Sequence, residues 1–162
     1  MGDGEPGVDV ANVVDFLRAA MEFDWTWGVD GVQRFSEIVG WTPAEFGTDT
    51  VVVMMTKARL AKPFALFTVA DQKLDEVTVH LTDFAEPQSR EFLLNVFNTA
   101  CASLIDVLGD PMVRVPGRNA KILWRTPKFV GELVVLDGNV TASVVRPDSR
   151  LIVDELQAHG VL

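Results

Sequence analysis

Residues 129–146 read FVGELVVLDGNVTASVVR, two apolar runs that meet at the dipeptide Asp137-Gly138. Asp-Gly between such runs is the strongest short-range signal for a two-residue β-hairpin turn, and turns of this type require positive φ angles. The sequence therefore predicts antiparallel strands over residues 129–136 and 139–146. It also predicts that a β-branched residue is poorly tolerated at Gly138, because only glycine adopts positive φ freely.

Four further segments have the composition of strands. They are rich in β-branched and aromatic residues, and they cover residues 50–56, 64–70, 75–82 and 121–125. The third segment alternates, with apolar residues at Val77, Val79 and Leu81 and polar residues between them. Short turns between consecutive strands indicate antiparallel pairing.

Four segments are typical of helices. Apolar residues recur at helical spacing over residues 9–21, and Asp30 is a good N-cap for a short second helix. A long third helix has Pro87 in its first turn and ends at Gly109, with an apolar stripe wide enough to cover a sheet. Asp148 is expected to cap a final helix.

The element order is α-α-β-β-β-α-β-β-β-α, which predicts an α+β fold. We expect a mainly antiparallel sheet of about six strands covered by helices. The chain has 162 residues, which fits one domain. We place that domain at residues 8–162, after a disordered, acidic and glycine-rich tail at residues 1–7.

The net charge of −9 is unevenly distributed along the chain. Residues 1–86 hold fifteen acids and six bases, whereas residues 87–162 hold eight of each. An acidic surface repels phosphate backbones and speeds association with basic proteins. We therefore expect a basic protein partner and no nucleic acid, with solubility alone as the alternative explanation of the charge.

The composition also bears on localisation. The N-terminus lacks the basic and apolar regions of a secretory signal. No apolar run approaches the roughly 20 residues that a membrane span needs. A single cysteine excludes an internal disulfide. These features predict a cytoplasmic protein that does not bind membranes.

No set of residues has the spacing of a catalytic, cofactor or metal site. Cys101 lies beside the apolar stripe of the long helix, which favours an inert buried thiol over a nucleophile. His80 is either an exposed strand residue or an acid-base group in a groove on the open sheet face. His159 falls in a last helical turn, where its positive form would favour the helix dipole. We predict no catalytic residue, cofactor or metal, and an enzyme using His80 or Cys101 is the least favoured interpretation.

The tryptophans near the N-terminus either fill the core or anchor an interface. Asp24-Trp25-Thr26-Trp27 leads into the short second helix. Large aromatic residues serve both purposes, and core packing is the favoured interpretation. The candidate partner-binding residues are the acidic and aromatic residues of this region: Asp24, Trp27, Glu37, Trp41, Glu45 and Asp49.

Four motifs carry a resemblance to a known family. They are Asp-Trp-x-Trp at residues 24–27, Phe35 followed by Gly40-Trp41, Leu-Gly-Asp-Pro at residues 108–111, and Ile-Leu-Trp-Arg at residues 122–125. Over residues 8–146 the chain resembles an uncharacterised actinobacterial family of domains of unknown function. Small acidic proteins of this type are similar to immunity proteins encoded beside secreted toxins. No catalytic residues are established for the family, so the resemblance implies none here.

Two functions fit these features. We predict a non-enzymatic protein-binding domain, an immunity-type inhibitor that neutralises a toxin or secreted effector by direct binding. The alternative is an acidic escort chaperone for a secreted substrate protein. Such a chaperone would use an exposed apolar groove, and this alternative leaves a homodimer open.

Overall fold

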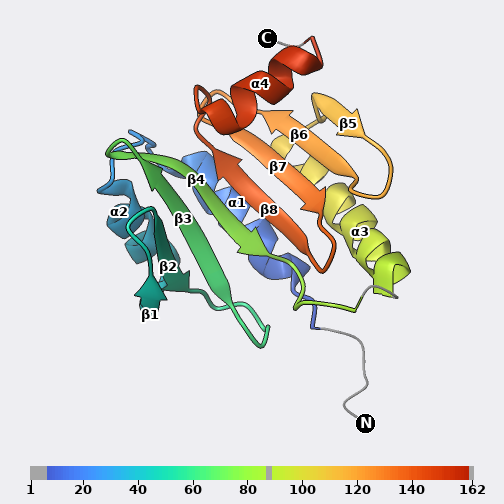
Figure 1. Ribbon diagram of the computed structural model, residues 1–162, viewed down its shortest axis with the longest axis horizontal. Helices are drawn as coiled ribbons and strands as arrows, with labels where there is room; N and C mark the ends of the chain where they lie inside the picture. Colours follow the sequence, from blue (N-terminus) through green and yellow to red (C-terminus); the bar gives the residue numbers. More distant parts are fainter. Residues whose placement is uncertain (1–6, 87–88, 161–162) are drawn as a thin grey trace.

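A computed structural model describes residues 7–86 and 89–160, which form one antiparallel sheet and four helices (Figure 1). The described elements are α1 (Val10–Glu22), α2 (Gly31–Val39), β1 (Thr42–Gly47), β2 (Val51–Met55), β3 (Phe64–Ala70), β4 (Lys73–His80), α3 (Arg90–Leu108), β5 (Val113–Val115), β6 (Lys121–Arg125), β7 (Val130–Val135), β8 (Val140–Val145) and α4 (Arg150–Ala158).

The sheet consists of two four-stranded meanders that meet at its centre. Its strand order is β1-β2-β3-β4-β8-β7-β6-β5. All neighbouring pairs are antiparallel. β4 and β8 join the two meanders, with Glu76 opposite Val145 at one end of the pairing and His80 opposite Thr141 at the other. β1 and β5 therefore form the two edges of the sheet.

The predicted α+β class is confirmed, but the prediction of about six strands is wrong, since the described sheet has eight. β1 and β5 are the two strands that the sequence pattern does not indicate, so each predicted run of three strands becomes a run of four. β1 contains Pro43 and Gly47, is almost entirely exposed, and pairs irregularly with β2. β5 has only three residues. Both are edge strands, which bond on one side only and need no alternating apolar pattern.

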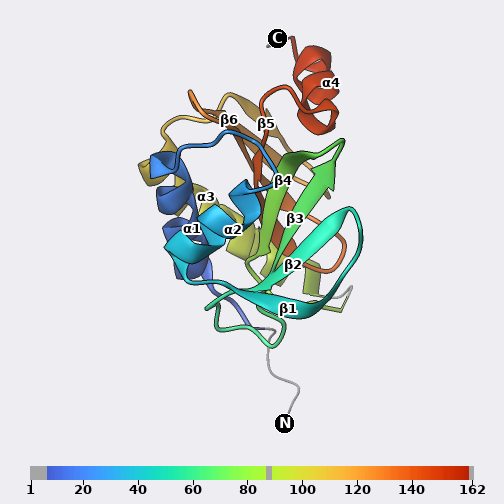
Figure 2. The same ribbon diagram turned by 90° about the vertical axis from the view of Figure 1, so that its left-hand side faces the viewer.

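Helices cover the two faces of the sheet unequally. α1, α2 and α3 lie on one face, where they enclose the main core with the inward residues of the strands (Figure 2). α4 lies on the opposite face, near one end of β6, β7 and β8 (Figure 1). Its Ile152 and Leu156 pack there on Leu123 and Val145 in a smaller apolar cluster. We call the face that carries α4 the open face, because no other described helix covers it (Figure 2).

The turn at Asp137-Gly138 is placed as predicted, but its backbone differs from the prediction. The Leu136 N–H donates to the Asn139 carbonyl at 2.8 Å, which closes the turn around Asp137 and Gly138 between β7 and β8. Neither Asp137 nor Gly138 is among the residues with positive φ, so the expected conformation is wrong. Space at this position is tight, since a Cβ on Gly138 would lie 3.2 Å from the Phe84 ring.

Positive φ angles occur in the other central hairpin. β3 and β4 pair as far as Ala70 opposite Lys73. The two residues between them, Asp71 and Gln72, have φ of 52° and 64°. Two consecutive left-handed residues are the signature of a type I′ turn. This turn forms without a glycine.

The helix starts differ from the sequence prediction in one case. The residue before α4 is Ser149, and Asp148 instead pairs with Arg146 at 2.7 Å, so the predicted cap is wrong. Ser89 is the N-cap of α3. The expected first-turn position of Pro87, and residues 1–6 of the expected tail, lie outside the described residues.

Candidate functional site

A cleft of about 330 Å³ lies on the open face, across the centre of the sheet. Strand alternation creates it. Val77 and Val79 of β4 point into the main core, so Glu76, Thr78 and His80 point to the open face and line the cleft. Polar residues of β7 and β8 line it beside β4. Val51, Leu66, Val134 and Leu136 supply apolar walls.

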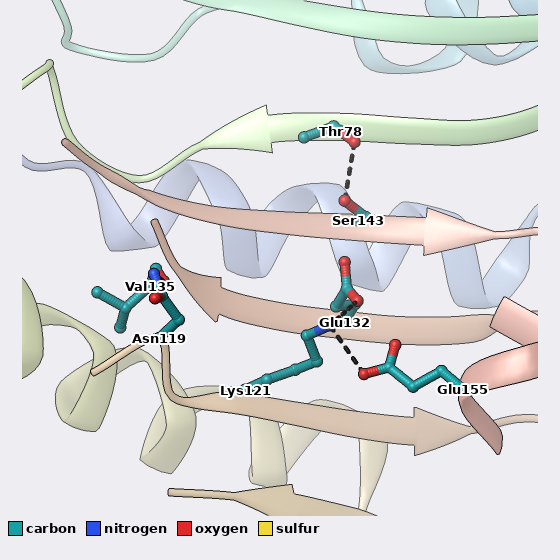
Figure 3. Close-up of polar contacts among 7 residues, drawn as sticks. All are labelled: Thr78, Asn119, Lys121, Glu132, Val135, Ser143 and Glu155. Carbon is teal, nitrogen blue, oxygen red and sulfur yellow. Dashed lines mark hydrogen bonds and ion pairs between the residues drawn. The ribbon is translucent and has the colours of Figure 1, made fainter. Parts of the chain in front are cut away.

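A row of polar contacts crosses the strands at this cleft (Figure 3). The hydroxyls of Thr78 and Ser143, directly opposite each other on β4 and β8, are 2.8 Å apart. On the β6 side, Lys121 Nζ lies 2.8 Å from Glu155 Oε1 and 3.5 Å from Glu132 Oε2 (Figure 3). Glu155 belongs to α4, so this ion-pair network holds α4 against the sheet.

Asn119, drawn in the same view, lies outside the cleft and fixes the approach to β6. Its Nδ2 donates to the Val135 carbonyl at 2.8 Å (Figure 3). The neighbouring backbone reinforces this contact, because the Val135 N–H donates to the Ala120 carbonyl at 2.9 Å. The start of β6 is thereby held against the end of β7.

The two carboxyl groups of the cleft have perturbed pKa values. Burial, and next the charge of Glu132, raise the pKa of Glu76 to about 7, although a hydrogen bond with Thr78 opposes the shift. Burial also raises the pKa of Glu132, against the opposing charge of Lys121. Within the described part of the chain, no basic side chain lies at ion-pair distance from Glu76. Glu76 is therefore the carboxyl group that lacks a counter-charge.

His80 lies in the same cleft but at its far end. Its Nδ1 accepts a hydrogen bond from Asn139 Nδ2 at 2.7 Å, which leaves the ring proton on Nε2 in the neutral form. Burial lowers the pKa of His80, although the charge of Asp83 partly opposes this. His80 is four positions after Glu76 on β4, about 13 Å away at a rise of roughly 3.3 Å per residue. Their backbones are too far apart for the two groups to form a hydrogen-bonded acid-base pair.

The four acidic candidate residues are all on the surface. Asp24, Glu37, Glu45 and Asp49 are exposed, but they do not form one cluster. Asp24 and Glu37 belong to the helical side of the molecule. Glu45 lines a groove along β1 and β2, and Val51 lines both this groove and the cleft. Glu45 and the turn that carries Asp49 therefore adjoin the cleft.

The aromatic candidate residues are not equally accessible. Trp41 is 7% exposed and its ring packs against those of Phe16, Phe35 and Phe67 in the main core. Its side chain is therefore not on the surface. Trp27 is half-buried and stacks on Trp25 with ring centroids 4.8 Å apart. The favoured interpretation, core packing, is confirmed for Trp41.

Cys101 lies on the buried side of α3. It is 8% exposed and belongs to the main core, as expected from its place beside the apolar stripe. It also lines a hollow of about 580 Å³ between α3 and the β5–β6 edge, together with Leu94 and Phe97. Across the described residues, no group of three or more His, Cys, Asp or Glu is placed to hold a metal ion.

α3 is also long and apolar enough to cross a membrane by length and composition. Core helices pass the same test, and here Leu93, Ala100 and Leu104 of α3 are buried in the main core.

The sequence pattern indicates His80 as a residue of the open sheet face, but it does not indicate the carboxyl groups of the cleft. The available signal was a charged residue inside an apolar strand, as at Glu132 within residues 129–136. Glu76 could be placed beside it only from the strand order, since the two residues are brought together by the pairing of β4 with β8 and of β8 with β7.

The fold and the cleft define an α+β domain built on one antiparallel sheet with a polar cleft on its open face. Residues 11–146 match a family of unknown function, DUF6301, and the chain belongs to this family. The expected resemblance is confirmed at the level of an uncharacterised family. A crystal structure of a DUF4309 family protein, YjgB, from Bacillus subtilis subsp. subtilis str. 168 is similar, with a TM-score of 0.45 and 13% sequence identity. The match covers 85% of this chain and 95% of that one. No curated protein matches the sequence.

Proposed function

We propose that this chain is a non-enzymatic domain that binds a basic protein partner, as an immunity-type inhibitor of a toxin or secreted effector. The observation that supports this best is the exposure of all four acidic candidate residues, in the half of the chain that holds the whole net charge of −9. Opposite potentials raise association rates and favour basic partners. The proposal includes a cytoplasmic location and no binding of nucleic acid or membranes.

Exposed apolar side chains lie beside two of these acids. Ile38, which follows Glu37, is 64% exposed, and Phe46, which follows Glu45, is 56% exposed. Interfaces commonly combine a few apolar anchors with a charged rim. α2 and β1, which carry these pairs, are visible from the same side of the molecule (Figure 2). This side can therefore offer both charge and apolar contact to one partner.

The test begins with an affinity pull-down of the tagged protein from its native cytoplasm. With the captured partner, higher ionic strength should mainly slow association. Charge reversal to lysine at four exposed acids should do the same: Asp24, Glu37, Glu45 and Asp49. A matched variant reverses four exposed acids of the other half: Glu91, Asp106, Asp110 and Asp154.

The matched variant has the same net charge, so it separates position from total charge. It should associate faster than the first variant. Association that is insensitive to salt and equal for both variants would contradict the proposal and leave the acidity as a solubility feature.

An escort chaperone is the second candidate. The hollow beside α3, with Leu94, Phe97 and Ile122 among its lining residues, is the observation that favours it. A chaperone would bind apolar segments of an unfolded substrate, and this binding would be little weakened by salt. The salt dependence of partner binding therefore distinguishes the two functions.

A further inference from the structure

We propose that the cleft on the open face receives an arginine side chain of the protein partner, and that Glu76 pairs with its guanidinium group. The inference rests on the proposed function, because it takes the partner to be a basic protein. It adds the place where a specific basic side chain of that partner would bind.

The charges of the cleft favour a cation. Glu76 and Glu132 both line it. Lys121 is the nearby cation, but it lies closer to Glu155, at 2.8 Å, than to Glu132, at 3.5 Å. One lysine thus serves two carboxylates, and in the described chain Glu76 has no cation within ion-pair distance. A partly buried carboxylate gains most from a partner that brings both charge and hydrogen bonds.

The walls of the cleft favour arginine over a compact cation. Val51, Leu66 and Val134 line it with apolar surface, and Thr68 and Thr78 add hydroxyl groups. Arginine packs its aliphatic stem on apolar surface while its planar guanidinium binds a carboxylate through two parallel hydrogen bonds. At about 330 Å³ the cleft is at the small end of ligand pockets, which suits one side chain.

The position of the cleft connects it to the acidic surface. Val51 lines both the cleft and the groove that contains Glu45 and Phe46. A partner attracted to Glu45 and Asp49 would therefore reach the rim of the cleft without a second docking event.

The ionisation of the cleft makes such binding depend on pH. Burial and the charges of Glu132 and Asp75 hold the pKa of Glu76 at about 7, while Asp75 itself is paired with Arg146. A bound guanidinium would lower this pKa. Affinity should then rise about tenfold from pH 6 to pH 8, as the ionised fraction of a group with a pKa near 7 increases.

Other ionisable groups along the cleft act in the same direction or stay constant. Burial also raises the pKa of Glu132, so any change in its ionisation acts in the same direction. His80 loses any positive charge over the same interval, because burial lowers its pKa. The pKa of Lys121 is raised, so its charge does not change.

A direct test uses end-blocked Gly-Arg-Gly as the probe and Gly-citrulline-Gly as its uncharged counterpart. In NMR titrations of the full chain, the arginine peptide should shift backbone amide signals of Glu76, Thr78 and Ser143, and its affinity should be higher at pH 8 than at pH 6. The citrulline peptide should bind at least tenfold more weakly. Glu76→Gln should abolish the difference between the peptides, and Glu91→Gln, at an exposed residue of α3, should preserve it.

Equal binding of the two peptides, shifts confined to other surfaces, or full arginine binding by Glu76→Gln would each overturn the inference. A melting curve confirms that the Glu76→Gln variant is folded. The result is separable from the proposed function. If the cleft does not bind the arginine peptide while partner association remains sensitive to salt and to charge reversal, the arginine site is disproved and the proposed function stands. If the cleft binds the arginine peptide while the captured partner associates independently of salt, the proposed role of the acidic surface is contradicted and the arginine site stands.

Discussion

The burial of Glu76 makes the stability of the fold depend on pH. Its pKa rises from 4.5 to about 7, so the folded chain holds this proton more tightly than the unfolded chain does. The stabilisation is complete below about pH 4.5 and is lost as the pH rises to 7. Glu76→Gln should therefore raise the free energy of unfolding by about 1–3 kcal/mol at pH 8 and by much less at pH 5.

Urea unfolding at the two pH values measures this difference. Glu45→Gln, at an exposed carboxyl group, is the control and should change stability little at either pH. The same gain for Glu76→Gln at both pH values would show that its carboxyl group titrates normally in the folded state.

A second residue-scale prediction concerns the ion pair between β4 and the end of β8. Arg146 Nε lies 3.1 Å from Asp75 Oδ1, and Asp75 is 8% exposed. Arg146→Met would leave that buried carboxylate unpaired and should lower the free energy of unfolding by about 2–4 kcal/mol. The other partner of Arg146 is Asp148, whose side chain is 76% exposed. Asp148→Asn should therefore lower the free energy of unfolding by less than about 1 kcal/mol.

A double-mutant cycle with Asp75→Asn isolates the pair. If Arg146→Met costs as little as Asp148→Asn, the pair does not stabilise the fold.

Cys101 should be unreactive in the folded protein, since its side chain is 8% exposed and packs in the main core. Thiol labelling at neutral pH should be slow in buffer and fast in denaturant. Rapid labelling of the folded chain would mean that the hollow beside α3 admits reagents to the sulfur atom.

At the scale of elements, the β3–β4 turn offers a stabilising substitution. Gln72 has φ of 64°, a conformation that an L-residue adopts at a cost of about 1–2 kcal/mol and glycine adopts without strain. Glycine also gives the unfolded chain more conformational freedom, which opposes part of this gain. Gln72→Gly should therefore raise the free energy of unfolding by roughly 0.5–1 kcal/mol. Thermal unfolding of the variant and the unchanged chain measures this gain in stability.

Gly138→Ala provides the contrast in the other hairpin. That position has no positive φ, but an added Cβ would press on Phe84 at 3.2 Å, so stability should fall. Gln72→Gly and Gly138→Ala should therefore change the free energy of unfolding in opposite directions. A loss of stability in Gln72→Gly would show that the turn does not have its left-handed backbone.

The two hairpins also show what the sequence could predict. Alternation and β-branched composition locate strands that bury one face, which is why residues 64–70 and 121–125 were predicted with the bounds of β3 and β6. β1 is exposed, contains Pro43 and, as an edge strand, pairs with β2 on one side, so no local pattern marks it. An Asp-Gly dipeptide locates a turn, but it does not fix the backbone conformation, since neither Asp137 nor Gly138 has a positive φ.

At the scale of the whole molecule, the cleft depends on strand order, which short-range patterns do not contain. Glu76 and Glu132 lie on different meanders and meet only because β8 stands between β4 and β7. The sequence could indicate that His80 faces the open side of a strand. It could not show which polar residues of other strands share that surface, because this requires the long-range pairing of β4 with β8.

That central pairing has a kinetic consequence. Thr78 and Ser143 bond across it although they are 65 positions apart in the chain, whereas the turns within each meander are short. Closing so long a loop carries a large entropic barrier, so each meander should form locally before β4 meets β8, and their meeting should limit the folding rate. Stopped-flow measurements can locate this step. Val53→Ala, in β2, weakens contacts that form before this step, so it should mainly slow refolding and change the unfolding rate little.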